Sequence, residues 1–392
     1  MFRSNLERTE ELRMSARSPA RMRAMRPLLP FLFSLFCGAA VQAQWWKVQT
    51  SGINSNLRGV TVAETQDATG VPVPVVWASG SNGVILKSVD EGKTWNRLHV
   101  TGGDALDFRG IIAFDASTAY VMSSGEGEKS RIYKTTDGGE TWNLQYSDKR
   151  RKFFLDAVAC LSKTHCFALG DPIDGKFLLL ATTDGEHWSP LPNGSMPAAL
   201  PGEGAFAASN TCLAVFGKEI FFGTGGPAAR VFHSTGLGRT WAVSETPIDS
   251  GKPSAGIFSL ALSGGNLIMA VGGDYKEPGR PYRVAAYSAD DGKTWHLAAQ
   301  QPSGYRSSVA RIDDGYRVAV GPNGEDVSGD SGAHWRHTDS LNLNALAILN
   351  IRTGWAVGPS GTIARFVNHH QYEIHDHHPH GHQKQASSAI AD

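Results

Sequence analysis

Six copies of one short motif constrain the fold more than any other feature of this sequence. The motif reads Ser/Thr-x-Asp-x-Gly-x-Thr-Trp with small variations, and it occupies residues 88–95, 135–142, 182–188, 234–241, 288–295 and 328–335. The Asp position advances by 47, 47, 52, 54 and 40 residues from copy to copy. Such a period fits four short strands with their loops, so the sequence predicts the blades of a β-propeller.

Each copy, called a box here, predicts a tight hairpin turn. The Asp side chain accepts hydrogen bonds from backbone N–H groups, the following Gly takes a positive φ, and the Trp packs its ring against a strand. In the fourth copy Gly236 replaces the Asp, so we expect that turn to be the loosest. The structural residues of the boxes are Asp90, Trp95, Asp137, Trp142, Asp184, Trp188, Trp241, Asp290, Trp295, Asp330 and Trp335.

Strand-like runs surround each box and set the number of blades at seven. Runs rich in β-branched and aromatic residues at 57–63 and 75–80 precede the first box, and the same layout recurs along the chain. A seventh unit begins at Leu343 and stops at Phe366 without a box. Residues 44–49 resemble its missing outer strand. We therefore predict an all-β, seven-bladed propeller of four-stranded blades over residues 44–368, closed by the N-terminal strand beside residues 362–367.

The N-terminus has the pattern of an export signal. Arginines precede an apolar run at 28–40, and Val41-Gln42-Ala43 supplies the small residues of a cleavage site. The run is too short to span a bilayer, so an uncleaved anchor is the weaker alternative. We expect residues 1–43 to be removed and the mature protein to be periplasmic or secreted, with no membrane span. The true translation start stays open, because the arginine-rich stretch before Met22 is longer than export needs.

The net charge of the predicted mature protein indicates which class of partner it does not bind. The formal net charge of the chain is zero, but residues 1–43 hold seven arginines and three glutamates, which leaves 30 basic and 34 acidic residues in the rest. A nucleic-acid partner requires the opposite balance, so we expect none. We expect the mature protein to be a monomer.

The topology of such blades predicts where binding residues lie. Box turns share a face with the loops between strands one and two, so the starts of the first strands and the loops between strands two and three lie on the opposite face. Binding residues concentrate on such loops. The predicted residues of this channel mouth are Arg58, Arg109, Asp156, Asp171, Asp174, Glu203, Asp274 and Arg306.

The three arginines of this set allow two interpretations. Converging from separate blades, they form a cationic site for a carboxylate, a phosphate or an acidic peptide. Alternatively, each pairs with an acidic neighbour such as Asp156 or Glu203 and only joins blades together.

The boxes, together with Leu57-Arg58-Gly59 and Phe108-Arg109-Gly110 at the starts of successive blades, resemble the photosystem II stability/assembly factor-like family of Asp-box (BNR-repeat) propellers. The resemblance covers roughly residues 44–368. It implies a non-enzymatic assembly factor or scaffold that binds a partner protein.

An enzyme is the alternative, because sialidases and other glycoside hydrolases use the same box. A sialidase would need an arginine triad, a Tyr nucleophile with a Glu beside it and an Asp acid, whereas another carbohydrate-active hydrolase would use two of the mouth carboxylates.

Cysteine and histidine residues add two further predictions. Cys160 and Cys166 flank a five-residue turn, so they can face each other across a hairpin and oxidise, whereas Cys212 is expected to be buried. The propeller itself calls for no cofactor. The tail at 369–392 is expected to be disordered and either merely solvated or able to bind Zn²⁺, Ni²⁺ or Cu²⁺ adventitiously. Its candidate ligands are His369, His370, His375, His377, His378, His380 and His382.

Overall fold

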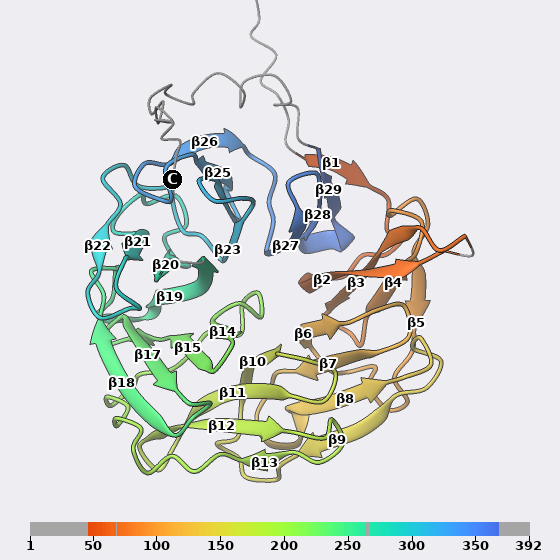
Figure 1. The fold of residues 1–392 in the computed structure, drawn as a ribbon, viewed down its shortest axis with the longest axis horizontal. Coiled ribbons are helices and arrows are strands. Elements are labelled where there is room, and N and C mark those ends of the chain that lie inside the picture. The colour runs from red at the N-terminus through yellow and green to blue at the C-terminus, as the bar shows by residue number, and fades with distance from the viewer. Residues whose placement is uncertain (1–45, 68, 264–265, 368–392) are drawn as a thin grey trace, which may run out of the picture. The chain divides into compact units, whose positions relative to one another are not determined.

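The computed structural model describes residues 46–67, 69–263 and 266–367, which form seven antiparallel sheets around a central channel (Figure 1). This confirms the predicted seven-bladed, all-β propeller. The first strand of each blade lies nearest the axis and the fourth lies outermost. In the described part of the chain no helix is long and apolar enough to cross a membrane. The predicted export signal and the histidine-rich tail lie outside the described residues and stay predictions.

The first four blades each contain four strands in chain order. Blade one holds β2 (Leu57–Gln66), β3 (Pro72–Gly80), β4 (Ile85–Ser88) and β5 (Asn96–Leu98), and blade two holds β6 (Phe108–Ala113), β7 (Ala119–Ser123), β8 (Arg131–Thr135) and β9 (Asn143–Ser147). Blade three holds β10 (Leu155–Cys160), β11 (Cys166–Ile173), β12 (Lys176–Thr182) and β13 (Ser189–Pro190), and blade four holds β14 (Leu213–Phe216), β15 (Glu219–Gly223), β17 (Arg230–Thr235) and β18 (Thr240–Glu245).

The remaining blades complete the ring. Blade five holds β19 (Lys252–Ser263), β20 (Leu267–Asp274), β21 (Ala285–Ser288) and β22 (His296–Leu297), and blade six holds β23 (Ser308–Arg311), β24 (Arg317–Gly321), β25 (Gly324–Ser328) and β26 (Arg336–Asp339). Blade seven holds β27 (Ala345–Asn350), β28 (Thr353–Val357), β29 (Ile363–Phe366) and β1 (Trp46–Gln49).

Blade five departs from the predicted four strands. A two-residue strand, β16 (Gly225–Gly226), leaves the loop of blade four and pairs with an extended β19 that begins at Lys252. Glycine is required there, because a Cβ on Gly225 would lie 2.5 Å from the carbonyl oxygen of Ala255. In blade three the second and third strands also extend into their connection, since β11 and β12 turn at Asp174 and Gly175.

The N-terminal strand closes the ring as predicted. Strand β1 pairs antiparallel with β29, with Trp46 opposite Phe366 and Gln49 opposite Ile363. The Trp46 side chain is fully buried, and its indole N–H donates to Glu325 of blade six. Burial raises the pKa of Glu325 to about 7, and the hydrogen bonds from Thr338 and Trp46 oppose this upward shift. One residue of β1 therefore joins its own blade to the preceding one.

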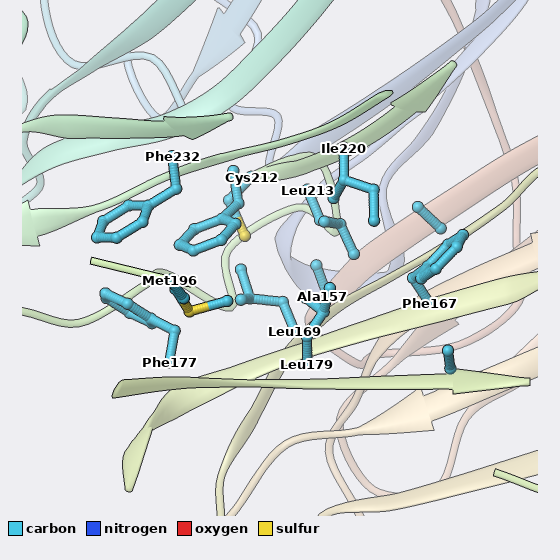
Figure 2. Close-up of a cluster of buried hydrophobic side chains, with 13 residues drawn as sticks. Ala157, Phe167, Leu169, Phe177, Leu179, Met196, Cys212, Leu213, Ile220 and Phe232 are labelled. Carbon is cyan, nitrogen blue, oxygen red and sulfur yellow. The ribbon is translucent and has the colours of Figure 1, made fainter. Parts of the chain in front are cut away.

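Apolar contacts between facing sheets form the core. Figure 2 shows the largest cluster, between blades three and four, where Phe177 faces Phe232 and Met196 fills the space beside them. The ring of Phe177 lies 5.1 Å from that of Phe222 and 5.2 Å from that of Phe232. Burial of these side chains stabilises the contact between blades through the hydrophobic effect.

All six box turns share one hydrogen bond. The hydroxyl of the first Ser or Thr accepts the N–H of the box glycine at 2.8–2.9 Å in every copy. In the five copies with Asp, its carboxylate also accepts a backbone N–H, as from Thr94 to Asp90 at 2.9 Å. The fourth copy, with Gly236 in place of Asp, lacks the carboxylate acceptor but keeps the bond from Gly238 to Ser234, and the Thr240 hydroxyl donates to the carbonyl of Thr235 at 3.2 Å.

Box turns also bond to the neighbouring loops of their own face. The backbone N–H of Gly138 donates to Ser117, that of Asp291 to Asn266 and that of Ser331 to Gly315. Each acceptor lies between the first and second strands of its blade. The boxes and these loops therefore occupy one face, and the starts of the first strands lie on the other.

Cys160 and Cys166 form a disulfide bond, with a sulfur–sulfur distance of 2.04 Å. They are directly opposite partners on β10 and β11. Cys212 is buried and free, as the sequence predicted.

We predict that Trp46→Ala lowers the free energy of unfolding by about 3–5 kcal/mol, because it leaves a cavity and removes one of the hydrogen-bond donors of buried Glu325. Val48→Ala is the matched control, since Val48 lies on the same strand and is 53% exposed. It should cost less than about 1 kcal/mol. Urea denaturation followed by circular dichroism measures both. Equal losses in the two variants would contradict the role of Trp46 in closure.

Candidate functional site

In four blades the first strand carries a β-bulge at the position of Arg58 or its equivalent. The pairing register shifts between Leu57 and Gly59, between Phe108 and Gly110, between Leu155 and Ala157, and between Ile257 and Ser259. A bulge leaves one residue out of the ladder and redirects its side chain. The residues at these bulges are Arg58, Arg109, Asp156 and Phe258, and all four line one pocket at the channel mouth.

Blades six and seven place a residue at the equivalent position without a bulge. Ser307 and Asn344 directly precede β23 and β27, and their backbone N–H groups donate to Val320 and Val357. Both residues line the same pocket. This central pocket has a volume of about 520 Å³, and its other walls come from Phe154, Asp171, residues 205–208, Tyr275, Tyr305 and Pro322.

The two arginines of the central pocket differ in their partners. The Nε of Arg109 lies 2.7 Å from a carboxylate oxygen of Asp107, and its Nη1 donates to the carbonyl of Ala207 at 3.0 Å. Arg58 has Asn56, a neutral amide, beside it, and among the described residues no carboxylate is in ion-pair contact with it. Burial and the charge of Arg109 lower the pKa of Arg58. Arg58 is thus the cation whose charge a ligand can match.

Two carboxylates face the same pocket. The Asp156 side chain is 1% exposed, and neither of its oxygens accepts a hydrogen bond within the described residues. Burial, followed by the charge of Asp171, raises the pKa of Asp156 well above its usual range, and Arg109 opposes this shift. Asp171 accepts one N–H, from Ala205 at 3.2 Å, and burial raises its pKa to about 6.

An aromatic wall completes the central pocket. The ring of Phe206 stacks on Phe258 with centroids 3.8 Å apart, and Tyr305 meets Phe258 edge to face at 4.7 Å. Tyr275 lies 6.2 Å from Phe258 and is 47% exposed. The pocket thus combines cationic, acidic and aromatic surfaces.

Arg306 was predicted at the mouth, and the structure corrects this. Its side chain is fully buried, with Nε 2.7 Å from a carboxylate oxygen of Asp326 and Nη1 2.6 Å from Asn323. The cause is register: the backbone N–H of Arg306 bonds the preceding blade just as those of Leu57 and Leu343 do. Arg306 therefore takes the inward position of Leu57, and Ser307 takes that of Arg58. Nor does the side chain of Arg306 join two blades, because Asp326 belongs to blade six itself.

Three other predicted residues also lie away from the central pocket. Glu203 is buried in an ion pair with Arg230, whose Nε is 2.9 Å away, and Asp274 pairs with Lys252 at 2.9 Å. Asp174 is exposed on the turn between β11 and β12. Of the eight predicted residues, the central pocket brings together Arg58, Arg109, Asp156 and Asp171.

Sequence reasoning missed the residues of the aromatic wall. Phe206 belongs to a long segment between β13 and β14, whose only sequence signal is the 52-residue interval between the third and fourth boxes. Glu203 holds this segment, accepting the N–H of Leu200 and the hydroxyl of Thr224. Phe258 carries a better signal, because Ile257-Phe258-Ser259 matches Leu57-Arg58-Gly59 in its pattern of apolar, variable and small residues.

A second pocket of about 910 Å³ adjoins the first. It shares Phe154, Asp171, Ala205 and Phe206 with the central pocket and continues to Arg151 and Lys152. The second pocket thus adjoins the central pocket on the side of blades three and four. Within the described ranges, no group of three or more His, Cys, Asp or Glu residues is arranged to hold a metal ion.

Comparisons with known proteins show the fold. No protein-family model and no curated protein sequence matches this chain. Among solved structures it is similar to YCF48 bound to D1 peptide, with a TM-score of 0.60 and 14% identity over 83% of this chain and 97% of that one. YCF48 from Cyanidioschyzon merolae gives a TM-score of 0.59 and 14% identity over 83% and 99% of the two chains. U3-55K gives 0.56 and 12% over 83% and 99%.

The two YCF48 structures bear out, at the level of the fold, the resemblance to photosystem II stability/assembly factor-like propellers. The match to U3-55K extends over nearly the same share of the chain, so the common property of these three proteins is the propeller.

We predict that the carboxyl of Asp171 titrates near pH 6, because burial disfavours its charged form. Asp290 on a box turn is the internal reference, since hydrogen bonds from Thr294 hold its pKa at about 2. Carbon-13 NMR of aspartate-labelled protein measures both, with Asp171→Asn assigning the signal. A midpoint for Asp171 at or below about 4 would show that its carboxyl is solvated.

Proposed function

We propose that this protein is a non-enzymatic, exported β-propeller that binds an acidic segment of a partner protein, or a small anionic ligand, at the central pocket. Its role would be that of an assembly factor or scaffold. The export signal predicted at residues 1–43 supports a periplasmic or secreted location.

The observation that carries this proposal is the presentation of Arg58 at the mouth. A β-bulge turns the Arg58 side chain toward the pocket, burial strengthens its field, and the neutral amide of Asn56 lies beside it. Arg109 adds a second guanidinium, although Asp107 neutralises part of its charge. Guanidinium groups pair with carboxylates through two parallel hydrogen bonds, so an anionic group of a ligand is the matching chemistry.

The size and continuity of the pockets favour a chain segment as the ligand. A volume of about 520 Å³ lies within the range of ligand sites and admits a few side chains. The adjoining second pocket, of about 910 Å³, extends this surface and ends beside Arg151 and Lys152. An extended segment with its acidic end at Arg58 fits this arrangement.

The comparisons lend support at the level of the fold. A propeller with a TM-score of 0.60 to this one has been solved with a bound peptide. Glycan hydrolysis, the alternative considered from the sequence, is not favoured by these comparisons.

We predict that Arg58→Gln weakens binding of Nα-acetyl-L-norleucine, a minimal model of a peptide carboxyl end, by about tenfold or more, because a charge-assisted pair is lost. Arg58→Gln with Arg109→Gln should abolish measurable binding. The wild-type protein should prefer the carboxylate over the corresponding primary amide by a similar factor. Titration followed by NMR chemical shifts measures these affinities.

The matched control is Arg352→Gln, an exposed arginine on the turn between β27 and β28, on the box face. It should bind as the wild type does. Unchanged binding in the double arginine variant, with circular dichroism spectra that match the wild type, would refute an anion site at the mouth.

A further inference from the structure

The charges around the central pocket do not balance. Asp107 and Arg109 form an ion pair with each other at 2.7 Å. Arg58 then stands alone against two carboxylates, Asp156 and Asp171, neither of which is in ion-pair contact with a cation among the described residues. With its carboxylates ionised, the pocket therefore has room for one more positive charge.

Among these groups, Asp156 is the one whose ionised form is least stabilised by its surroundings. It is 1% exposed, both of its oxygens lack hydrogen-bond donors in the described part of the chain, and it lines the pocket from the bulge of β10. Burying an ionised carboxylate without a partner costs several kcal/mol of free energy. This cost is comparable with the whole free energy of unfolding of a domain. A buried carboxyl group without hydrogen-bond donors that also lines a pocket is a candidate site for a partner outside the chain.

The surroundings of Asp156 and Asp171 select the chemistry of that partner. Phe206, Phe258 and Tyr305 present ring surfaces to the same pocket, and Tyr275 stands at its edge. Carboxylates beside aromatic rings suit an ammonium group, because the ring quadrupole and the anions both attract it. An anionic or purely apolar ligand would leave the two carboxylates unmatched.

We propose that the central pocket binds a protonated amine, held between Asp156 and Asp171 against the aromatic wall, so that its ligand carries both an ammonium group and a carboxylate. The carboxylate half of this proposal rests on the proposed function at Arg58, whereas the ammonium half stands on Asp156 and Asp171. The amine is either a lysine side chain near the end of a bound segment or a free α-amino group.

Three small probes separate these possibilities, and all carry one carboxylate. Nα-acetyl-L-norleucine has no amine, Nα-acetyl-L-lysine adds a side-chain ammonium, and free L-norleucine has an α-ammonium. Binding is measured by isothermal titration calorimetry at pH 8, where Asp171 is ionised. The variants are Asp156→Asn, Asp171→Asn and the double variant. Asp174→Asn is the matched control, because Asp174 is exposed and lies outside the central pocket.

The wild-type protein should bind one of the amine probes about tenfold or more tightly than Nα-acetyl-L-norleucine. Each single Asn variant should reduce this preference, and the double variant should remove it. The affinity for Nα-acetyl-L-norleucine should stay the same or increase in these variants, since a negative charge is removed. Asp174→Asn should keep the wild-type preference. The preferred amine probe identifies the source of the ammonium.

Two results would overturn the inference: affinities for all three probes within about twofold of one another in the wild type, or a preference that survives in the double Asn variant. The two proposals fail separately. Loss of Nα-acetyl-L-norleucine binding alone would remove the carboxylate site and keep the amine site. Failure of all three probes to bind would refute both.

Discussion

The pairing of β1 with β29 is the constraint on which the rest of this structure depends. It joins residues almost at opposite ends of the described chain and buries Trp46 between blades six and seven. Closure holds the first strands of all seven blades at fixed positions around one axis. Side chains from blades one, two, three, five, six and seven can then meet in one pocket although they lie far apart in the sequence.

The two faces of the ring use local backbone geometry for different purposes. On one face the box turns satisfy their own backbone groups through a Ser or Thr hydroxyl and, in five copies, an Asp carboxylate. On the other face, β-bulges in four blades each release one residue from the ladder. The repeated sequence motif thus stabilises the fold, and the variable residue at each bulge supplies chemistry.

The sequence predicts most of this fold but only part of the site. Box spacing and the lone strand at 44–49 suffice for the blade number and the closure, because they depend on local patterns. Arg58 and Arg109 precede glycines and line the central pocket, whereas Arg306 was placed at the mouth as the start of a first strand and lies one residue out of register. The aromatic wall depends on how the segment between β13 and β14 folds back over the ring, and no periodic signal reports that.

The central claim is that the face opposite the boxes binds a ligand between Arg58 and the carboxylates of Asp156 and Asp171. The most direct test is a crystal structure of the protein with Nα-acetyl-L-lysine or L-norleucine, whichever of these two amine probes binds more tightly. The account predicts electron density in the central pocket, with the carboxylate at Arg58 and the ammonium within hydrogen-bond distance of Asp156 or Asp171. A ligand bound on the box face, or one in the central pocket with its ammonium in solvent, would contradict it.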